Sequence, residues 1–387
     1  MAIYLIVLII LLIPLFFKQR QSSIKYNSYY WFEFFVLFLL MGLRFRVGGD
    51  SLRYELYYSY TPNLKELFAQ GIWFTNEGFQ PLWVLFQATC KSISDDFVVV
   101  QIIHSFVVNG VIFYFVKKNI ENRFTFNILY YLLSYFYFNT EIMRESLAVV
   151  CFLVGFRFLV EKKYISYYLL CILAFMFHAS AIYLFVLPLV YPLFAKLKGY
   201  KSYVVLFGAS FIISYYTTNI LDLLTNTVFA GNTLLENKSE MVAQSTGLNI
   251  FGVTSVIISL LPLFFILYVY KNKEESSKFI LLMYLLVNII GMVFLPLNRL
   301  SNYFSILFLC VFTNVITDNK IKSKYRIQVI GAVILLLGFR FQYYLGGMMT
   351  ENGKSKEYKM YEIYIPYHSI FDKEYEVRRE RAIENQM

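Results

Sequence analysis

Uninterrupted apolar stretches recur from one end of this 387-residue chain to the other, and most are about 15–20 residues long, close to what a helix needs to cross a bilayer. In hydrocarbon only helices and closed barrels satisfy their backbone groups, and these stretches are continuous rather than alternating, which favours helices. Hydrophobic residues make up 58% of the chain and charged residues 16%, whereas soluble domains carry about a quarter charged residues. We therefore predict an all-α polytopic integral membrane protein.

Lysines in the short loops between these stretches predict the topology, because cytoplasmic loops are enriched in positive charge. The later lysine clusters are separated by two apolar stretches each, the parity expected if all of them face the cytoplasm. The net charge of +10 therefore indicates membrane orientation rather than nucleic-acid binding. About 12 transmembrane helices are predicted, at residues 2–17, 28–45, 97–116, 124–138, 145–160, 164–178, 180–195, 202–218, 250–270, 278–297, 299–316 and 328–345.

The stretch 79–90 is short and holds Gln80, Pro81 and Gln87. If it crossed the membrane, the lysine cluster at Lys117 would move outside and every later loop would break the charge rule. We therefore predict one re-entrant or interfacial helix here, the alternative being a true span with a weaker charge bias. The resulting organisation is a single transmembrane domain, residues 1–345, followed by a tail, 346–387. The segments 46–78 and 218–249 and the tail are expected outside.

Ionisable residues near the ends of spans gather on the predicted outer side. Such residues are costly at membrane depth and usually face a bundle interior or a cavity. They are Arg44, Asp50, Glu77, Arg144, His178 and Arg299. Arg144 begins a predicted helix, and an arginine at the positive end of a helix is an anion site. Because arginine suits bidentate phosphate recognition, we predict an external cavity for a diphosphate or polyanion.

Simpler roles remain open for each of these residues. Arg44 and Asp50 could form a loop ion pair, and Glu77 could cap a helix. Arg144 and Arg299 could be interfacial anchors. The four cysteines all lie in apolar stretches without metal-ligand spacing, and no Asp-x-Asp pair or ligand cluster occurs, so no metal or cofactor is expected.

Short motifs link these residues to a known family. They are Arg44, Val47-Gly48-Gly49-Asp50, Tyr54, Glu77-Gly78-Phe79, Arg144, Ser146-Leu147-Ala148, Phe177-His178, Ser180-Ala181, Arg299, Tyr303 and Ile365-Pro366-Tyr367. In this order, across nearly the whole chain, the set resembles the EpsG-like branch of the Wzy-type bacterial polysaccharide polymerases. Two positions depart from the family pattern, with Glu145 where Gln is common and Gly49 where Thr is common.

The resemblance implies a metal-independent glycosyltransferase with a GT-C-like helical fold, multi-pass in the bacterial inner membrane. Such enzymes join oligosaccharide repeat units carried on undecaprenyl diphosphate, at the periplasmic or outer face, to build O antigen, capsule or exopolysaccharide. A chain-length regulator and a flippase of the same pathway are the implied partners. We expect Arg144 and Arg299 to bind the diphosphate with help from Arg44. The candidate bases are His178, Asp50 and Glu77, and the candidate substrate contacts are Tyr54, Asn139, Glu145 and Tyr303.

Two other enzyme or transport functions compete with this interpretation. An O-antigen-ligase-type glycosyltransferase would use the same arginines and histidine on a different acceptor. A transporter or flippase for lipid-linked sugars would predict inverted repeats and ionisable residues at the bilayer midplane, and neither pattern is visible. A non-catalytic scaffold is the remaining alternative.

Overall fold

The computed structural model describes residues 2–16, 24–71, 73, 78–195, 275–291, 299–318 and 359–384, with a few positions between 323 and 334. These residues are helical and contain no β-strand, apart from one isolated antiparallel bridge between Arg44 and Ser369. The all-helical prediction is therefore confirmed. Contacts divide the chain into two compact units, a first of Met1–Ile182 with Gly338–Met387 and a second of Tyr183–Leu337.

The first unit contains most of the described helices. They are α1 (Ala2–Leu12), α2 (Ile24–Gly42), α3 (Ser51–Ser59), α4 (Leu64–Gln70), α5 (Pro81–Lys91), α6 (Val98–Asn119), α7 (Arg123–Tyr130), α8 (Phe136–Thr140), α9 (Met143–Val160), α10 (Tyr164–Phe177) and α19 (Val377–Glu384). A π-helical turn at Tyr131–Tyr135 joins α7 to α8, so the predicted span 124–138 is helical throughout. A 3-10 helix, η4 (Met360–Ile363), precedes α19.

Each predicted span that falls on described residues is helical, but the span count is not tested along the whole chain. Among the described residues, two helices, α6 and α17 (Leu300–Thr317), are long and apolar enough to cross a membrane, and four shorter apolar helices accompany them. The predicted spans 202–218 and 250–270 lie outside the described residues, as does most of 328–345. The number of 12 crossings and the GT-C-like architecture therefore stay predictions.

Helix α5 covers most of the stretch 79–90, for which the sequence predicts a re-entrant or interfacial helix. It has 11 residues, and at 1.5 Å per residue it is about 16 Å long, half of what the hydrocarbon core requires. Pro81 occupies its first turn, where a missing backbone N–H costs nothing. The length agrees with the predicted re-entrant or interfacial helix rather than with a full span.

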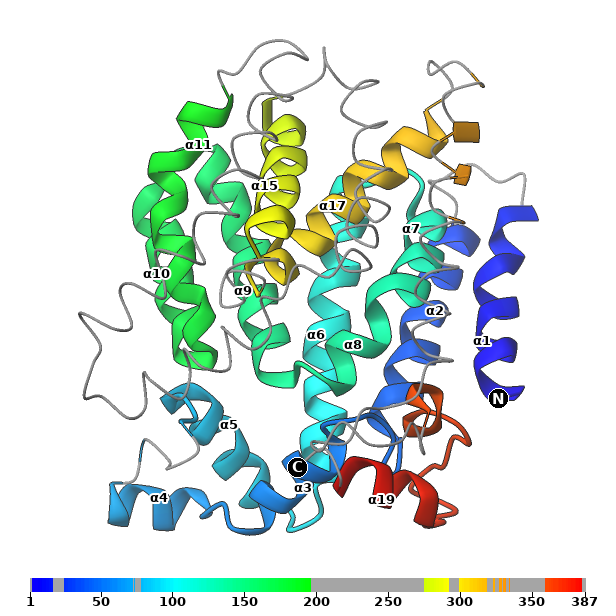
Figure 1. Ribbon diagram of the computed structural model, residues 1–387, viewed down its shortest axis with the longest axis vertical. Coiled ribbons are helices and arrows are strands. Elements are labelled where there is room, and N and C mark those ends of the chain that lie inside the picture. Colours follow the sequence, from blue (N-terminus) through cyan, green and yellow to red (C-terminus); the bar gives the residue numbers. More distant parts are fainter. Residues whose placement is uncertain are drawn as a thin grey trace. The chain divides into compact units, whose positions relative to one another are not determined.

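One end of the first unit collects the segments that carry the sequence motifs. In Figure 1, α3, α4, α5 and α19 lie at the lower end of this unit, where α2 ends and α6 and α9 begin. Helix α10 packs along α9 in the opposite direction and contacts α5, so its C-terminal end lies at the same end of the unit.

The second unit, taken alone, contains α11 (Leu187–Ala195), α15 (Glu275–Gly291) and α17 (Leu300–Thr317). Aromatic rings join these helices, with Tyr191 edge-on to Phe279 at 4.7 Å and Tyr284 stacked on Phe308 at 4.3 Å between ring centroids. Such pairs add roughly 0.5–1.5 kcal/mol beyond simple burial.

Candidate functional site

The segment that follows α2 is built around a fully buried arginine. Arg44 has no exposed surface, and it donates hydrogen bonds to the carbonyls of Met41 (2.5 Å) and Val47 (3.2 Å) and to the sulfur of Met143 (3.6 Å). These donors bond protein atoms rather than Asp50, so the simple Arg44–Asp50 ion pair considered from the sequence is not formed. Arg44 acts here as part of the frame of the site, which does not favour the predicted direct contact with a diphosphate.

The two glycines after Arg44 are needed because the loop touches the end of α8. Gly48 has φ +107°, and a Cβ atom there would lie 2.4 Å from Cβ of Thr140. A Cβ atom on Gly49 would lie 2.7 Å from Oε2 of Glu141. Any larger residue would push the loop away from α8. Glycine at both positions therefore lets the backbone that leads into Asp50 approach Glu141.

The C-terminal tail closes this loop from the other side. The carboxylate of Glu141 accepts hydrogen bonds from the Gly49 N–H (2.8 Å) and from the Tyr364 hydroxyl (2.7 Å). The N–H of Gly48 donates to the Ile363 carbonyl at 2.9 Å. Tyr367, in the predicted tail motif, donates to the carbonyl of Leu40 at 2.9 Å. The tail, which the sequence places only as an external segment, is thus part of the wall beside Asp50.

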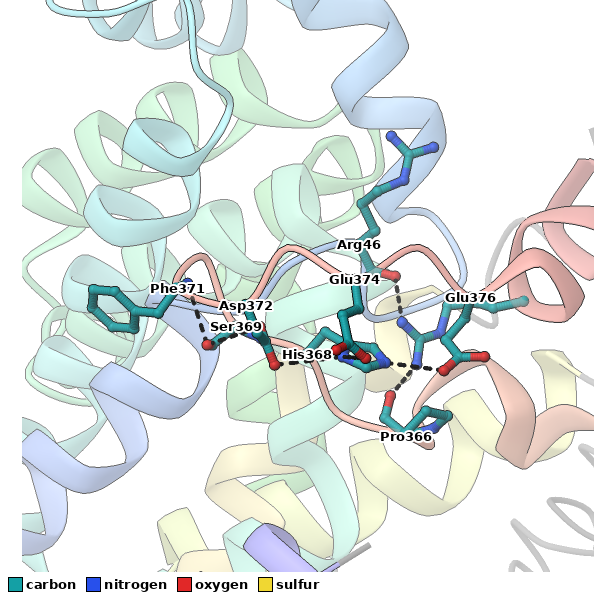
Figure 2. Close-up of polar contacts among 9 residues, drawn as sticks. Arg46, Pro366, His368, Ser369, Phe371, Asp372, Glu374 and Glu376 are labelled. Carbon is teal, nitrogen blue, oxygen red and sulfur yellow. Dashed lines mark hydrogen bonds and ion pairs between the residues drawn. The ribbon is translucent and has the colours of Figure 1, made fainter.

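Charged groups fasten the rest of the tail, as Figure 2 shows for part of this region. Arg379 is almost fully buried and donates to the carbonyls of Arg46, Glu362 and Pro366. Burial lowers the pKa of the Arg379 guanidinium. The Arg46 side chain forms ion pairs with Glu55 and Glu380, each at 2.8 Å.

His368, which the sequence alone could not place, lies within an acidic turn of the tail. Its Nε2 is 3.1 Å from Oε1 of Glu376, and its Nδ1 is 3.5 Å from Oδ2 of Asp372. The carbonyl of His368 accepts the Phe45 N–H at 2.8 Å. Its position indicates a structural role in holding the tail against the segment after α2.

Arg144 differs from these arginines because one of its donors has no protein acceptor. It is the second residue of α9, where backbone N–H groups point outward from the helix. Its guanidinium lies over the ring of Phe79, 4.4 Å from the centroid, while its buried Nε–H has no hydrogen-bond partner. A helix N-terminus with a free guanidinium donor favours an anionic ligand.

Tyr54 of α3 is a polar neighbour of Arg144. Burial raises the pKa of the Tyr54 phenol, and the charge of Arg144 together with hydrogen bonds from its side chain and backbone opposes this effect. The Asp50 carboxylate is close enough to raise the same pKa further. Asp50 itself is half-buried and directly precedes α3. The structure therefore brings Asp50, Tyr54 and Arg144 together, as the sequence predicts.

His178 ends α10 at the same end of the first unit, and its hydrogen bonds indicate its tautomer. The backbone N–H of Ser180 donates to Nδ1 at 3.2 Å, and the Ser180 hydroxyl lies 2.7 Å from the same nitrogen. A backbone N–H can only donate, so Nδ1 is an acceptor and the neutral ring carries its proton on Nε2. The role of His178 as base stays a prediction.

The other predicted site residues have different surroundings. Asn139 is fully buried, accepts from Asn109 at 2.9 Å and donates to the Tyr135 carbonyl at 2.8 Å, so its amide joins helices within the core. Glu145 is buried in the first turn of α9. In the second unit, Arg299 is exposed at the N-terminal end of α17, and Tyr303 is buried in that helix.

The predicted base Glu77 lies outside the described residues. Among the residues that are described, no group of three or more His, Cys, Asp or Glu side chains could hold a metal ion. Glu141 and Tyr364 have roles that the sequence did not assign to them, although Glu141 belongs to the polar interruption before α9 and Tyr364 directly precedes the tail motif.

The described residues together define a helical, apolar protein with a candidate arginine-based anion site at one end of its first unit. Comparison with known proteins identifies its family: residues 27–367 match the EpsG family, and the chain belongs to it. No curated protein and no solved structure matches the chain. Membership indicates a polysaccharide-polymerase type of function and a glycosyltransferase type of enzyme, and with the apolar helices it indicates a membrane protein.

Proposed function

We propose that the chain is a polysaccharide polymerase that joins oligosaccharide repeat units carried on undecaprenyl diphosphate, at the periplasmic or outer face of the bacterial inner membrane. One observation supports this most directly. Arg144 projects from the N-terminal turn of α9 with a buried Nε–H that no protein group accepts, beside Tyr54 and Asp50. A lipid diphosphate supplies the anionic oxygens that such a donor requires.

In the proposed reaction, a hydroxyl oxygen of the acceptor unit attacks the anomeric carbon of the donor sugar. The new carbon–oxygen bond forms while the bond from that carbon to the diphosphate breaks, and the electron pair leaves on the diphosphate. Arg144 stabilises the charge that develops there, and one such contact typically contributes about 10²–10³-fold in rate. The proton of the attacking hydroxyl passes to a carboxylate, for which Asp50 is the candidate.

His178, at the end of α10, is a further candidate base, or the group that positions the acceptor hydroxyl. Glu77 remains an alternative base. We assign a second diphosphate contact to Arg299, and substrate contacts to Tyr54, Glu145 and Tyr303. The arginines perform the charge stabilisation, so the proposal includes no metal and no cofactor.

The cellular setting belongs to the same proposal. We place the chain as a multi-pass protein of the inner membrane, working with a chain-length regulator and a flippase for the lipid-linked unit. The product would be an O antigen, a capsule or an exopolysaccharide. The apolar helices and the family support this setting.

A product-length assay tests the function. Purified protein in lipid nanodiscs is incubated with lipid-linked repeat units extracted from the source cells, and the products are resolved on a gel. A ladder of lengths supports the polymerase. One transfer to a lipid A core would support a ligase instead, and flipping in vesicles without any new glycan bond would exclude both enzymes.

Substitutions test the proposed diphosphate contacts in the same assay. Arg144→Ala and Arg299→Ala should each abolish elongation while the protein still inserts into membranes. Arg157→Ala is the matched control, because Arg157 lies on the same helix as Arg144 but is exposed and pairs with Glu161. Normal chain length in both of the first two variants would refute the assignment.

A further inference from the structure

Buried polar atoms without hydrogen bonds are unevenly distributed over the described residues. Such atoms are uncommon in native proteins, and each calls for a specific partner. Most of those found here lie on the segments around Arg144, namely Ser51, Gln80, Trp83, Gln87, Gln101, His104 and Arg144. These unpaired groups lie at one end of one unit, which favours a shared ligand over separate packing defects.

Helix α5 contributes two of these groups from one face. Trp83 and Gln87 are four residues apart and so lie on the same side of the helix. Their side chains are 0% and 1% exposed, and the indole Nε1–H and the amide Nε2 both lack a partner. The ring of Trp83 meets the ring of Tyr54 edge-on, with 5.7 Å between centroids. Since Tyr54 bonds Arg144, this face of α5 adjoins the proposed diphosphate site.

Helix α6 contributes a group near the start of α9. His104 holds the start of α9, because its Nε2 lies 2.9 Å from the carbonyl of Met143. Gln101 lies three residues before His104, on the same face of α6, and is only 3% exposed. Its Oε1 has no donor. The unpaired groups therefore include an acceptor on α6 and donors on α5.

The chemistry of these groups discriminates between ligands. Phosphate oxygens accept hydrogen bonds, so a diphosphate could satisfy Trp83, Gln87 and Arg144 but not the acceptor of Gln101. A lipid tail could satisfy none of them. A sugar hydroxyl both donates and accepts, and aromatic rings with a few convergent polar groups are typical of small-molecule sites. Neutral amide groups that donate or accept hydrogen bonds, beside aromatic rings, therefore fit a saccharide.

We infer that Trp83, Gln87 and Gln101 bind a sugar residue of the lipid-linked substrate, next to the diphosphate at Arg144. The inference rests on the proposed function for its choice of ligand, but it assigns a binding site of its own. It also explains why polar side chains occur within apolar helices, where an unpaired amide lowers stability.

Binding measurements separate this inference from the proposed function. The probes are lipid-linked oligosaccharide extracted from the source cells and undecaprenyl diphosphate without sugar, each titrated into protein in nanodiscs. Wild type should bind the sugar-bearing lipid more tightly. In Gln87→Met and Gln101→Met, and in Trp83→Phe, this preference should fall by about 5–10-fold per variant, as expected for one hydrogen bond, while affinity for the sugar-free lipid stays constant. Gln70→Met, on the exposed α4, is the matched control.

A stability readout distinguishes binding from packing. Met is close to Gln in shape and removes the unpaired amide, so Gln87→Met and Gln101→Met should keep or raise the unfolding temperature without substrate. A fall in stability with an unchanged preference for sugar would overturn the inference. So would equal affinity of the wild type for the two lipids. Retained sugar preference without polymer formation would instead reject the polymerase and leave the sugar site standing.

Discussion

Two arginines at one end of the first unit differ in what their side chains contact. Arg44 is fully buried, and its guanidinium donates to backbone carbonyls of Met41 and Val47. Arg144 is half-buried, lies over an aromatic ring and keeps a buried Nε–H without an acceptor. Sequence alone assigns both to diphosphate binding. The structure gives Arg44 a framework role and leaves Arg144 as the arginine for which we propose ligand binding.

The residues around Arg44 and Arg144 also differ in whether their polar groups are paired. Around Arg44, polar groups of the glycine loop and the tail bond to one another, as Glu141 does with Gly49 and Tyr364. Around Arg144, several buried donors and acceptors have no protein partner. Paired groups stabilise a fold, whereas unpaired buried groups reduce stability unless a ligand completes them. The unpaired buried groups therefore mark the proposed binding site more specifically than the positions of the charged residues do.

The largest expected effect comes from exchanging either arginine for methionine, a residue of similar reach without donors. Arg144→Met should lower the polymerisation rate by about 10²–10³-fold and change the free energy of unfolding by only about 1 kcal/mol, the size of its cation–π contact. Arg44→Met should lower that free energy by about 3 kcal/mol, because buried acceptors lose their donors. Denaturant unfolding and rate measurements on both variants check this. Similar profiles for the two would remove the distinction.

Glycine substitutions test the framework side of the contrast. Gly48→Ala should lower the free energy of unfolding by about 3 kcal/mol or more, because its Cβ would lie 2.4 Å from Cβ of Thr140 at φ +107°. Gly71→Ala is the control, since Gly71 also has a positive φ of +65° but open space around it. It should cost only about 1 kcal/mol of backbone strain. Equal losses in thermal unfolding would show that the contact with α8 does not matter.

Whether a feature of this protein can be predicted from the sequence depends on how far apart in the chain the interacting residues are. Apolar runs predict the helices well, since crossing length and continuity are local properties. The grouping of Asp50, Tyr54 and Arg144 was also predictable, from topology. The contact of Arg44 with Met143 and the closure by Tyr364 were not, because they depend on contacts between residues far apart in the chain. Gln101, three residues before His104 in an apolar helix, was a visible signal whose meaning required the neighbouring helices.

A smaller effect is expected where the tail meets the loop. Tyr364→Phe removes the hydroxyl that donates to Glu141 at 2.7 Å but keeps the ring. A hydrogen bond to a carboxylate contributes about 1.5–3 kcal/mol, so the free energy of unfolding should fall by that amount. Hydrogen exchange at Gly49 should rise at the same time, since its N–H bonds the same carboxylate. Tyr361→Phe, a tyrosine in the same tail segment, is the control. Unchanged exchange at Gly49 would separate the tail from the loop.

The smallest effect concerns pH and the acidic turn of the tail. Burial is the largest single influence on the pKa of the Asp372 carboxyl and raises it, but hydrogen bonds from the backbone N–H and hydroxyl of Ser369 act together to lower it below the ordinary value of 3.8. A folded-state pKa that is lowered favours the ionised form, so this contribution to docking is complete above the ordinary value and is lost as the pH falls through the lowered one. Hydrogen exchange of the tail, corrected for the intrinsic effect of pH, should therefore accelerate below about pH 4 in the wild type. Asp372→Asn should lose most of this acid dependence, whereas Glu374→Gln, farther from the His368 ring, should keep it. If Asp372→Asn follows the wild-type course instead, the acid sensitivity of the tail comes from other carboxylates and Asp372 does not hold the turn.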